Sequence, residues 1–311
     1  QLLDASPTDN YKTYKVTNAI MLEQLNKVYE LGSHDRQLSL RFTKALGTLA
    51  ADIREEEIIK VYGIDAPYYY LTESLCWPII EEIIKSKLMT EPMQVNERMR
   101  ELSLKMPVGS TVLTVVKCVE QMALYYNQTK SIGTLKLNTP EEYVQNYVNE
   151  YYLMDMFYRR ALEAYHELVT LDIPIEAVIN EAKRQLDQEY AKMANVMNLE
   201  WLTCVKEKGE AFRGVTLGRQ QNFYRTEGDG TVKQVVIVSD ALRYEVAVEL
   251  MQQLAKEKHI ATLTPYLAML PTETKYCKPA LLPHHSLGML GTEMLVDGTV
   301  LNTTDQRTAH L

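Results

Sequence analysis

Most of the first two thirds of the chain carries apolar residues three and four positions apart, the period of an α-helix. The clearest run starts at "NTPEEY", where Thr139 can cap a helix and Pro140 suits its first position. Residues on one face then recur to Leu168: Tyr143, Tyr147, Tyr151, Met154, Tyr158, Leu162, Tyr165 and Leu168. A second helix follows Pro174, with its own stripe of Ile175, Val178, Ala182, Leu186, Tyr190, Met193 and Met197. The short "LDIP" turn predicts that the two helices pack as an antiparallel pair.

Weaker helical patterns precede this pair and are separated by glycine and proline breaks. They cover residues 14–31, 36–51, 55–61, 69–89 and 112–126. No repeat of fixed period accompanies them, so a solenoid is not indicated. The tyrosine and methionine stripes are typical of helix packing rather than of a cofactor site. Residues 1–208 are therefore predicted to form an irregular all-α domain.

The pattern changes after residue 208. Residues 209–233 are rich in glycine and charge and are expected to be a linker or loop. Four apolar residues at 235–238 then predict a buried strand, followed by a helix over about 241–258 and a second strand-like run, "IATLTPYLAML". A strand, a crossover helix and a second strand predict a parallel sheet. Residues 234–311 are thus expected to begin an α/β domain.

Composition agrees with a soluble protein of two domains. The chain has 311 residues, 46% of them hydrophobic and 24% charged. A net charge of -8 argues against a uniformly basic nucleic-acid surface. The four cysteines form no Cys-x-x-Cys pair, which argues against a zinc knuckle and a disulfide framework: Cys76, Cys118, Cys204 and Cys277. With no membrane-spanning run and no signal peptide, we expect a cytoplasmic location and no membrane association.

An acidic residue, Asp240, follows the predicted strand at 235–238 directly. Ligands of open α/β sheets bind beyond the carboxyl ends of the strands, so Asp240 is a candidate metal ligand there. The alternative is that Ser239 or Asp240 caps the next helix, and spacing alone favours that alternative.

Two hydroxyl residues, Thr272 and Thr274, follow the second strand-like run and Pro271. A threonine hydroxyl beside a metal can attack phosphorus or sulfur. Its commoner role is to cap a helix or make a turn. Considered together, Asp240 and the threonines would meet at one edge of the sheet, as a metal-activated nucleophile requires.

The two segments that contain these residues resemble a known family. "VVIVSDALRYEVAVEL" and "LTPYLAMLPTETKYCKPALLPHHSL" are similar to the type A PglZ domain of BREX phage-defence systems, a branch of the alkaline phosphatase superfamily. The resemblance covers about residues 143–311 and is strongest over 235–287. It implies an alkaline-phosphatase-like α/β fold after the helical domain, and a cytoplasmic enzyme that works with other BREX proteins. A DNA contact is not indicated by any residue.

The resemblance also implies roles for individual residues. Asp240 would bind a divalent metal, expected to be zinc, and Thr274 would be the nucleophile and a ligand of the same metal. Thr272 is the alternative nucleophile if the register differs by two. For Arg243, phosphate contact and pairing with Glu245 both stay open.

Two features depart from the family pattern. Glu273 stands where the family has tyrosine, beside the proposed nucleophile. Later Asp and His ligands are also expected, and the remaining candidates do not match their motif: His284, His285, Asp297, Asp305 and His310. Because about seventy residues follow Asp240, we expect an incomplete sheet and little activity from this chain alone.

Two functions follow from these observations. The first is a part of a metal-dependent phosphatase or phosphodiesterase-like hydrolase of a BREX complex. The second is a helical interaction scaffold of that complex, with a non-catalytic α/β module. A haloacid-dehalogenase site would need a second Asp where Leu242 stands, and a glycine-rich phosphate loop does not follow residue 238.

Overall fold

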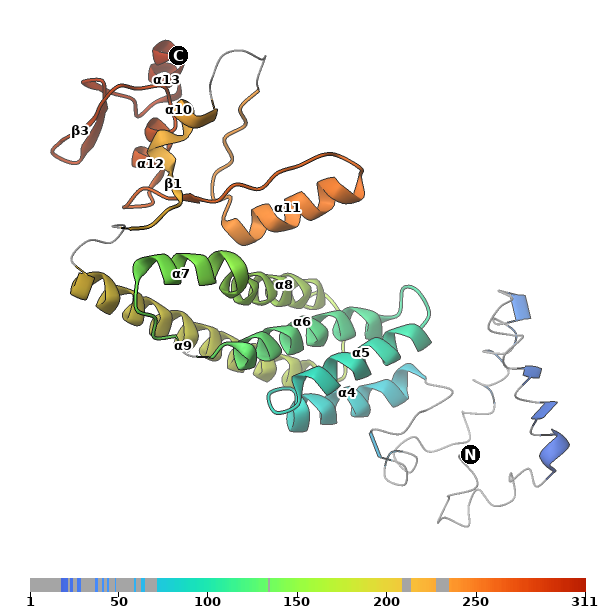
Figure 1. Ribbon diagram of the computed structural model, residues 1–311. Helices are drawn as coiled ribbons and strands as arrows, with labels where there is room; N and C mark the ends of the chain where they lie inside the picture. Colours follow the sequence, from blue (N-terminus) through green and yellow to red (C-terminus); the bar gives the residue numbers. More distant parts are fainter. Residues whose placement is uncertain are drawn as a thin grey trace. The chain divides into compact units, whose positions relative to one another are not determined.

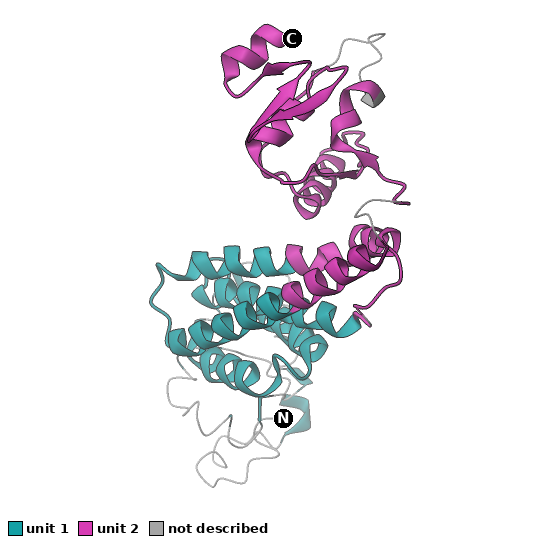
Figure 2. Cartoon of the chain, turned by 90° about the vertical axis from the view of Figure 1, so that its left-hand side faces the viewer, with its two compact units in different colours: residues 1–131, 157–192 teal, residues 132–156, 193–311 magenta. Residues whose placement is uncertain are grey.

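The computed structural model divides the chain into two compact units (Figure 2). Unit 1 comprises residues 1–131 and 157–192, and unit 2 comprises residues 132–156 and 193–311. The structure describes residues 72–133, 135–208, 214–227 and 235–311, with isolated positions before residue 72. The helices predicted over 14–31, 36–51 and 55–61 lie largely outside the described residues.

Three helices open the described part of unit 1 (Figure 1): α4 (Glu73–Lys87), α5 (Pro92–Lys105) and α6 (Thr111–Ser131). The first and third confirm the helices predicted over 69–89 and 112–126. Helix α5 was not predicted, because Pro92 was interpreted as a break. In the structure Pro92 is the first residue of α5. Val95, Met99 and Leu102 follow it and form the buried face of this helix. Proline suits the first helical turn, where its missing N–H leaves no bond unmade.

Unit 1 also contains the facing parts of α8 (Tyr152–Leu168) and α9 (Glu176–Lys208). The Tyr158 hydroxyl donates to Asp187 Oδ1 at 3.0 Å, and the Tyr158 and Tyr190 rings stack with centroids 3.7 Å apart. Nearer the connecting turn, the Tyr165 hydroxyl donates to Asn180 Oδ1 at 2.8 Å. The residue of α8 nearer the turn contacts the residue of α9 nearer the turn, and the more distant residues contact each other. This order confirms the predicted antiparallel pair. Burial, with a smaller effect from Asp187, raises the pKa of Tyr158 to about 12.

The helical part of unit 2 begins with α7 (Pro140–Asn146), a π-helical turn η2 (Tyr147–Tyr151) and the start of α8. The predicted cap is confirmed, because Thr139 Oγ1 accepts the Glu142 N–H at 3.2 Å. The π-turn interrupts what the sequence predicted as one continuous helix. From the first residue of this turn, the Tyr147 hydroxyl donates to Asp155 Oδ2 in α8 at 2.5 Å. A single π-helical turn within a helix often lies at a functional site.

The remainder of unit 2 contains short helices and two small sheets (Figure 1). Its elements are β1 (Gly218–Arg219), η3 (Gln220–Asn222), α10 (Phe223–Glu227), α11 (Tyr244–Lys256), β2 (Tyr266–Leu267), α12 (Thr274–Ala280), β3 (Leu287–Leu290), β4 (Glu293–Val296), β5 (Thr299–Val300) and α13 (Thr304–His310). Strands β1 and β2 pair in parallel, and β3, β4 and β5 form an antiparallel sheet in that order. The C-terminal sheet was not predicted. The 209–233 segment, expected as a loop, contains β1, η3 and α10.

The prediction of a strand at residues 235–238 is wrong. The four residues form no strand, and their exposed fractions run from 48% for Val238 to 86% for Ile237. The neighbouring run, "IATLTPYLAML", contributes only the two residues of β2, which pair with β1. A strand is stabilised by a partner and by burial of one or both faces. No described strand lies beside residues 235–238, so their apolar pattern alone does not form a sheet.

A small core holds α12 against the C-terminal sheet. Tyr276 and Ala280 of α12 are buried against Met294 of β4, with Met269 and Leu287 packed at the edge. The Tyr276 hydroxyl donates to the carbonyl of Thr292 at 3.1 Å. This packing fixes the position of α12, whose first residue is the candidate nucleophile Thr274.

In the part of the chain that the structure describes, no helix is both long and apolar enough to cross a membrane.

Candidate functional site

Asp240 lies in a turn that precedes α11 rather than at the tip of a paired strand. The next residue, Ala241, has a φ of 56°, a conformation uncommon for alanine. Helix α11 begins three residues later, with Arg243 at its N-cap and no side-chain cap bond. The alternative that Ser239 or Asp240 caps this helix is therefore wrong. The Asp240 side chain is 62% exposed, which leaves it open to solutes.

The Asp240 carboxylate contacts the helix that begins at the candidate nucleophile. Its Oδ2 accepts from Lys278 Nζ at 2.6 Å, and Lys278 lies in α12, four residues after Thr274. Residues four apart in a helix lie on one face, with Cβ atoms about 6 Å apart. The structure thus brings Asp240 to the face of α12 at whose start Thr274 lies. It does so through a turn and a helix and not through neighbouring strand tips.

Neither threonine of "PTETK" caps a helix. Thr274 is the first residue of α12, Glu273 is the N-cap, and no side-chain cap bond is made there. Thr272 lies in the preceding turn, and both threonines are exposed. Glu273 is also exposed, with its carboxylate 3.6 Å from Lys275 Nζ. The acid beside the proposed nucleophile therefore points to solvent and has a cation close to it.

Gln220 holds together the two segments on either side of the threonines. Its Nε2 donates to the carbonyl of Cys277 in α12 at 3.1 Å, and its Oε1 accepts the N–H of Met269 at 3.1 Å. One side chain from η3 thereby bonds to Met269, before the turn that contains Thr272, and to Cys277 in α12, after that turn. This arrangement gives the exposed turn a defined place despite its lack of burial.

The pairing of Arg243 with Glu245, left open by the sequence, is confirmed. Arg243 Nε lies 2.9 Å from Glu245 Oε1, and the Glu245 side chain is fully buried. A buried carboxylate requires a charged or hydrogen-bonding partner, and Arg243 supplies the charge. Tyr244 between them packs edge-on against Tyr152, with centroids 5.3 Å apart.

Three of the later candidate ligands, His284, Asp297 and His310, make contacts within local structure. Arg225 Nη2 donates to the carbonyls of His284 and His285 at 3.4 and 3.1 Å. A nitrogen of His310, Nε2, lies 2.7 Å from the carbonyl of Pro283. Among the residues that the structure describes, no group of three or more His, Cys, Asp or Glu side chains could hold a metal ion.

Asp297 fixes the loop before β3. Its carboxylate accepts the N–H groups of Ser286 at 2.7 Å and of His285 at 3.0 Å, and the Ser286 hydroxyl at 3.2 Å. These bonds, led by the Ser286 N–H, hold the pKa of Asp297 below its usual value. Because the folded pKa is depressed, the stabilisation is present above the unfolded pKa, about 3.9. It is lost as the pH falls through the folded pKa.

We expect Asp297→Asn to destabilise this region at neutral pH and to change it little in acid. Asparagine tolerates the left-handed backbone at this position, where φ is 47°, so mainly the charge is lost. Thermal unfolding of wild type and variant between pH 2 and 7 measures the effect, with exposed Asp172→Asn as control. If the difference in Tm between wild type and Asp297→Asn stayed constant down to pH 2, the stabilisation would not come from the charged Asp297 carboxylate.

The candidate residues lie in a part of the chain that is similar to known proteins. Residues 222–311 match the profile of the BREX system PglZ alkaline phosphatase-like domain. This match covers less than a third of the chain. The predicted resemblance is thereby confirmed, and Asp240 and Thr274 both lie inside this PglZ-family region. Its assignment to type A stays a prediction.

Two curated relatives are much longer than the part of them that this chain matches. The alkaline phosphatase-like protein BrxZ of Escherichia coli O9:H4 (strain HS) is 45% identical over 76 residues, 22% of this chain and 9% of BrxZ. The alkaline phosphatase-like protein PglZ of Bacillus cereus (strain H3081.97) is 26% identical over 179 residues, 55% of this chain and 20% of that protein. The chain thus spans a fifth or less of these relatives. No solved structure matches it significantly.

Sequence reasoning missed two residues that position the site in the PglZ-family region. Lys278, the partner of Asp240, was passed over because 38 residues separate the two in sequence. Its spacing of four from Thr274 was the available signal, since that spacing puts both on one helix face. Gln220 lay in a segment interpreted as a loop and gave no signal.

Proposed function

We propose that this chain contributes Asp240 and Thr274 to the active site of a metal-dependent phosphatase or phosphodiesterase. The observation that supports this most is the contact between Asp240 and Lys278, which brings the carboxylate to the helix that begins at Thr274. Both residues lie in the region that matches an alkaline phosphatase-like domain. Neither side chain caps a helix.

In this proposal Thr274 is the nucleophile. Its hydroxyl oxygen forms a bond to phosphorus as the bond from phosphorus to the ester oxygen breaks. The ester oxygen takes a proton from water and leaves as the alcohol, and a second water then hydrolyses the phosphothreonine to phosphate and free Thr274. Because Thr274 is exposed, its proton can pass to water. Lys278, one turn along the same face, places a positive charge where the phosphoryl oxygens gain negative charge.

The divalent metal, expected to be zinc, is the part that the described residues do not complete. Asp240 offers one carboxylate, which an ammonium group already contacts at 2.6 Å. No other two candidate ligands among the described residues stand with it. Zinc sites in enzymes usually have three protein ligands. The described residues therefore do not fit a complete metal site, and no step of the proposed reaction is assigned to a metal ion.

The wider setting is part of the same proposal. We infer a cytoplasmic protein whose partners are other BREX components, because the matched domain is described as part of the BREX system. No described residue indicates contact with DNA. The helical scaffold stays an alternative, in which the PglZ-family region has no catalytic role.

Metal dependence tests the proposal directly. We expect the full-length protein that contains this chain to hydrolyse bis(4-nitrophenyl) phosphate, to lose that activity in EDTA, and to regain it with Zn²⁺. The release of 4-nitrophenol measures the rate. Calorimetry of metal binding by wild type and Asp240→Asn provides a second readout, with weaker binding expected for the variant. Hydrolysis that persists after complete removal of metal would refute the metal-dependent mechanism.

A further inference from the structure

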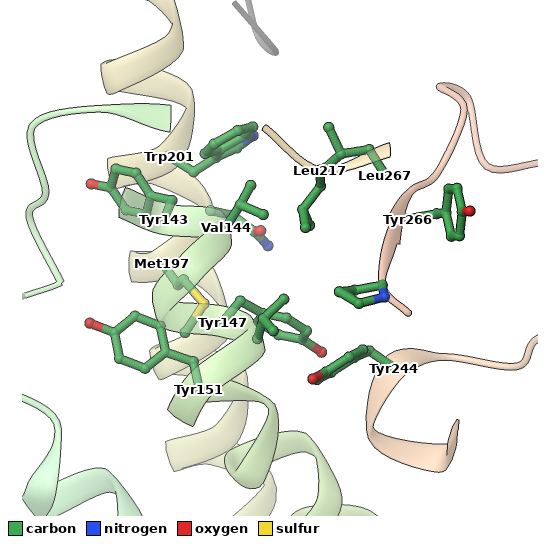
Figure 3. A pocket seen from close by; sticks show the side chains of 13 residues that line it. Tyr143, Val144, Tyr147, Tyr151, Met197, Trp201, Leu217, Tyr244, Tyr266 and Leu267 are labelled. Carbon is green, nitrogen blue, oxygen red and sulfur yellow. The ribbon is translucent and has the colours of Figure 1, made fainter. Parts of the chain in front are cut away.

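Unit 2 contains a cavity of about 340 Å³ whose wall is almost entirely apolar (Figure 3). Residues of α7, η2 and α9 form one side, and residues around β1, β2 and the start of α11 form the other. The lining residues are Tyr143, Val144, Tyr147, Val148, Tyr151, Met197, Asn198, Trp201, Leu217, Tyr244, Pro265, Tyr266 and Leu267. Its volume lies at the small end of ligand pockets, which suits a single ring system.

The aromatic side chains stand at angles to one another around this space. The rings of Tyr143 and Trp201 are 5.7 Å apart at 79°, and those of Tyr147 and Tyr244 are 6.4 Å apart at 55°. Figure 3 shows Tyr147 of η2 and Tyr244 of α11 next to each other, with Leu217 above them in the view. Inclined rings offer both faces and edges to a guest, as aromatic pairs prefer.

The composition of the wall selects the ligand. No charged side chain lines the cavity, and Asn198 supplies its single amide. An ion inside would lose its hydration without compensation, and the edge of a nucleobase would leave several hydrogen-bonding groups unpaired. A neutral aromatic hydrocarbon ring makes no such demand and gains from contact with the surrounding rings.

The cavity also adjoins the proposed site along the chain. Asp240 precedes the lining residue Tyr244 by four positions, a reach of about 14 Å at most when fully extended. Leu267, at the end of β2, lines the cavity and is seven residues before Thr274. Both segments that carry the candidate catalytic residues therefore also contribute to its wall.

We propose that the cavity holds an aromatic ring of the substrate, so that the preferred substrates are aryl phosphate esters. This inference rests on the proposed phosphoester hydrolase, and it adds the substrate class. The ring enters the apolar cavity while the phosphoryl group stays outside it, near Asp240 and Thr274. The cavity contributes affinity and orientation and takes no part in bond making.

Binding of two phosphonates to the full-length protein tests this arrangement without hydrolysis. Phenylphosphonate and methylphosphonate share the anionic group and differ by the ring, and neither contains an ester bond. We expect calorimetry to show phenylphosphonate binding at least tenfold more tightly. Val144→Phe, which fills the cavity, should remove that preference and leave methylphosphonate binding unchanged. Leu199→Phe, at a 55% exposed position of α9 outside the cavity, should retain it.

Kinetics separate a failure of this inference from a failure of the proposed function. Phenyl phosphate should show a KM at least tenfold below that of methyl phosphate, and Val144→Phe should raise the KM for the phenyl ester alone. Hydrolysis of both esters without a ring preference would overturn the aryl cavity and leave the hydrolase standing. Equal loss of ring preference in Leu199→Phe would overturn it as well. Absence of hydrolysis of any ester would overturn the proposed function itself.

Discussion

Replacing Thr274 with alanine is expected to lower phosphoester hydrolysis by the full-length protein about a thousandfold or more. Removal of a nucleophile abolishes the covalent route and leaves only the rate that binding and electrostatic stabilisation supply. Because Thr274 is exposed and makes no cap bond, its loss should not disturb α12. Release of 4-nitrophenol under single-turnover conditions measures the chemical step. An unchanged thermal unfolding profile would show that the fold is retained.

Thr272 provides the matched control, because it lies two residues away with the same side chain and similar exposure. We expect Thr272→Ala to retain most of the activity. Loss in Thr272→Ala with retention in Thr274→Ala would move the nucleophile by two positions. If neither substitution slowed hydrolysis, the nucleophile would lie elsewhere and the proposed role of "PTETK" would be wrong.

The helical part of the chain could largely be predicted from its sequence. The period of apolar residues gave the α8 and α9 pair, and Thr139 with Pro140 gave the start of α7. Such signals are local, since a helix satisfies its hydrogen bonds within its own segment. The π-turn at Tyr147–Tyr151 was missed because apolar residues keep nearly the same spacing through it.

The sheet could not be predicted in the same way, because strands depend on partners distant in sequence. Residues 235–238 have strong strand-forming side chains and form no strand in the described structure. Strand β2 pairs with Gly218–Arg219, a segment whose glycine and charge indicated a loop. Register and partner choice are tertiary properties, so a four-residue apolar run does not determine them.

The candidate site shows the same division. The sequence singled out Asp240 and the start of α12, and the structure pairs Asp240 with Lys278, which lies four residues after Thr274 in α12. Their expected place at two adjacent strand tips was wrong, since Asp240 follows an unpaired segment. The aromatic cavity escaped prediction because its walls come from α7, η2, α9 and the β1 and β2 segments. The lining tyrosines of α7 and η2 were interpreted as packing residues, and in this structure the packed rings leave a space between them.

The second large effect is expected from Leu186→Ala in α9, which should destabilise unit 1 by about 2–5 kcal/mol. Leu186 is fully buried, and truncation removes its contacts and leaves a cavity that the surrounding helices fill only in part. A shift of this size is large beside the usual free energy of unfolding of a domain, about 5–15 kcal/mol. Urea unfolding followed by circular dichroism at 222 nm measures it.

Leu199→Ala, in the part of the same helix that belongs to unit 2, separates burial from helix propensity. Both variants exchange leucine for alanine within α9, so the intrinsic helical term is the same and cancels in the comparison. Leu199 is 55% exposed, and its truncation should change the free energy of unfolding by no more than about 0.5 kcal/mol. Equal destabilisation by the two substitutions would mean that α9 does not bury the face that contains Leu186. The packing of α9 within unit 1 would then be wrong, since it is this buried face that joins α9 to its antiparallel partner.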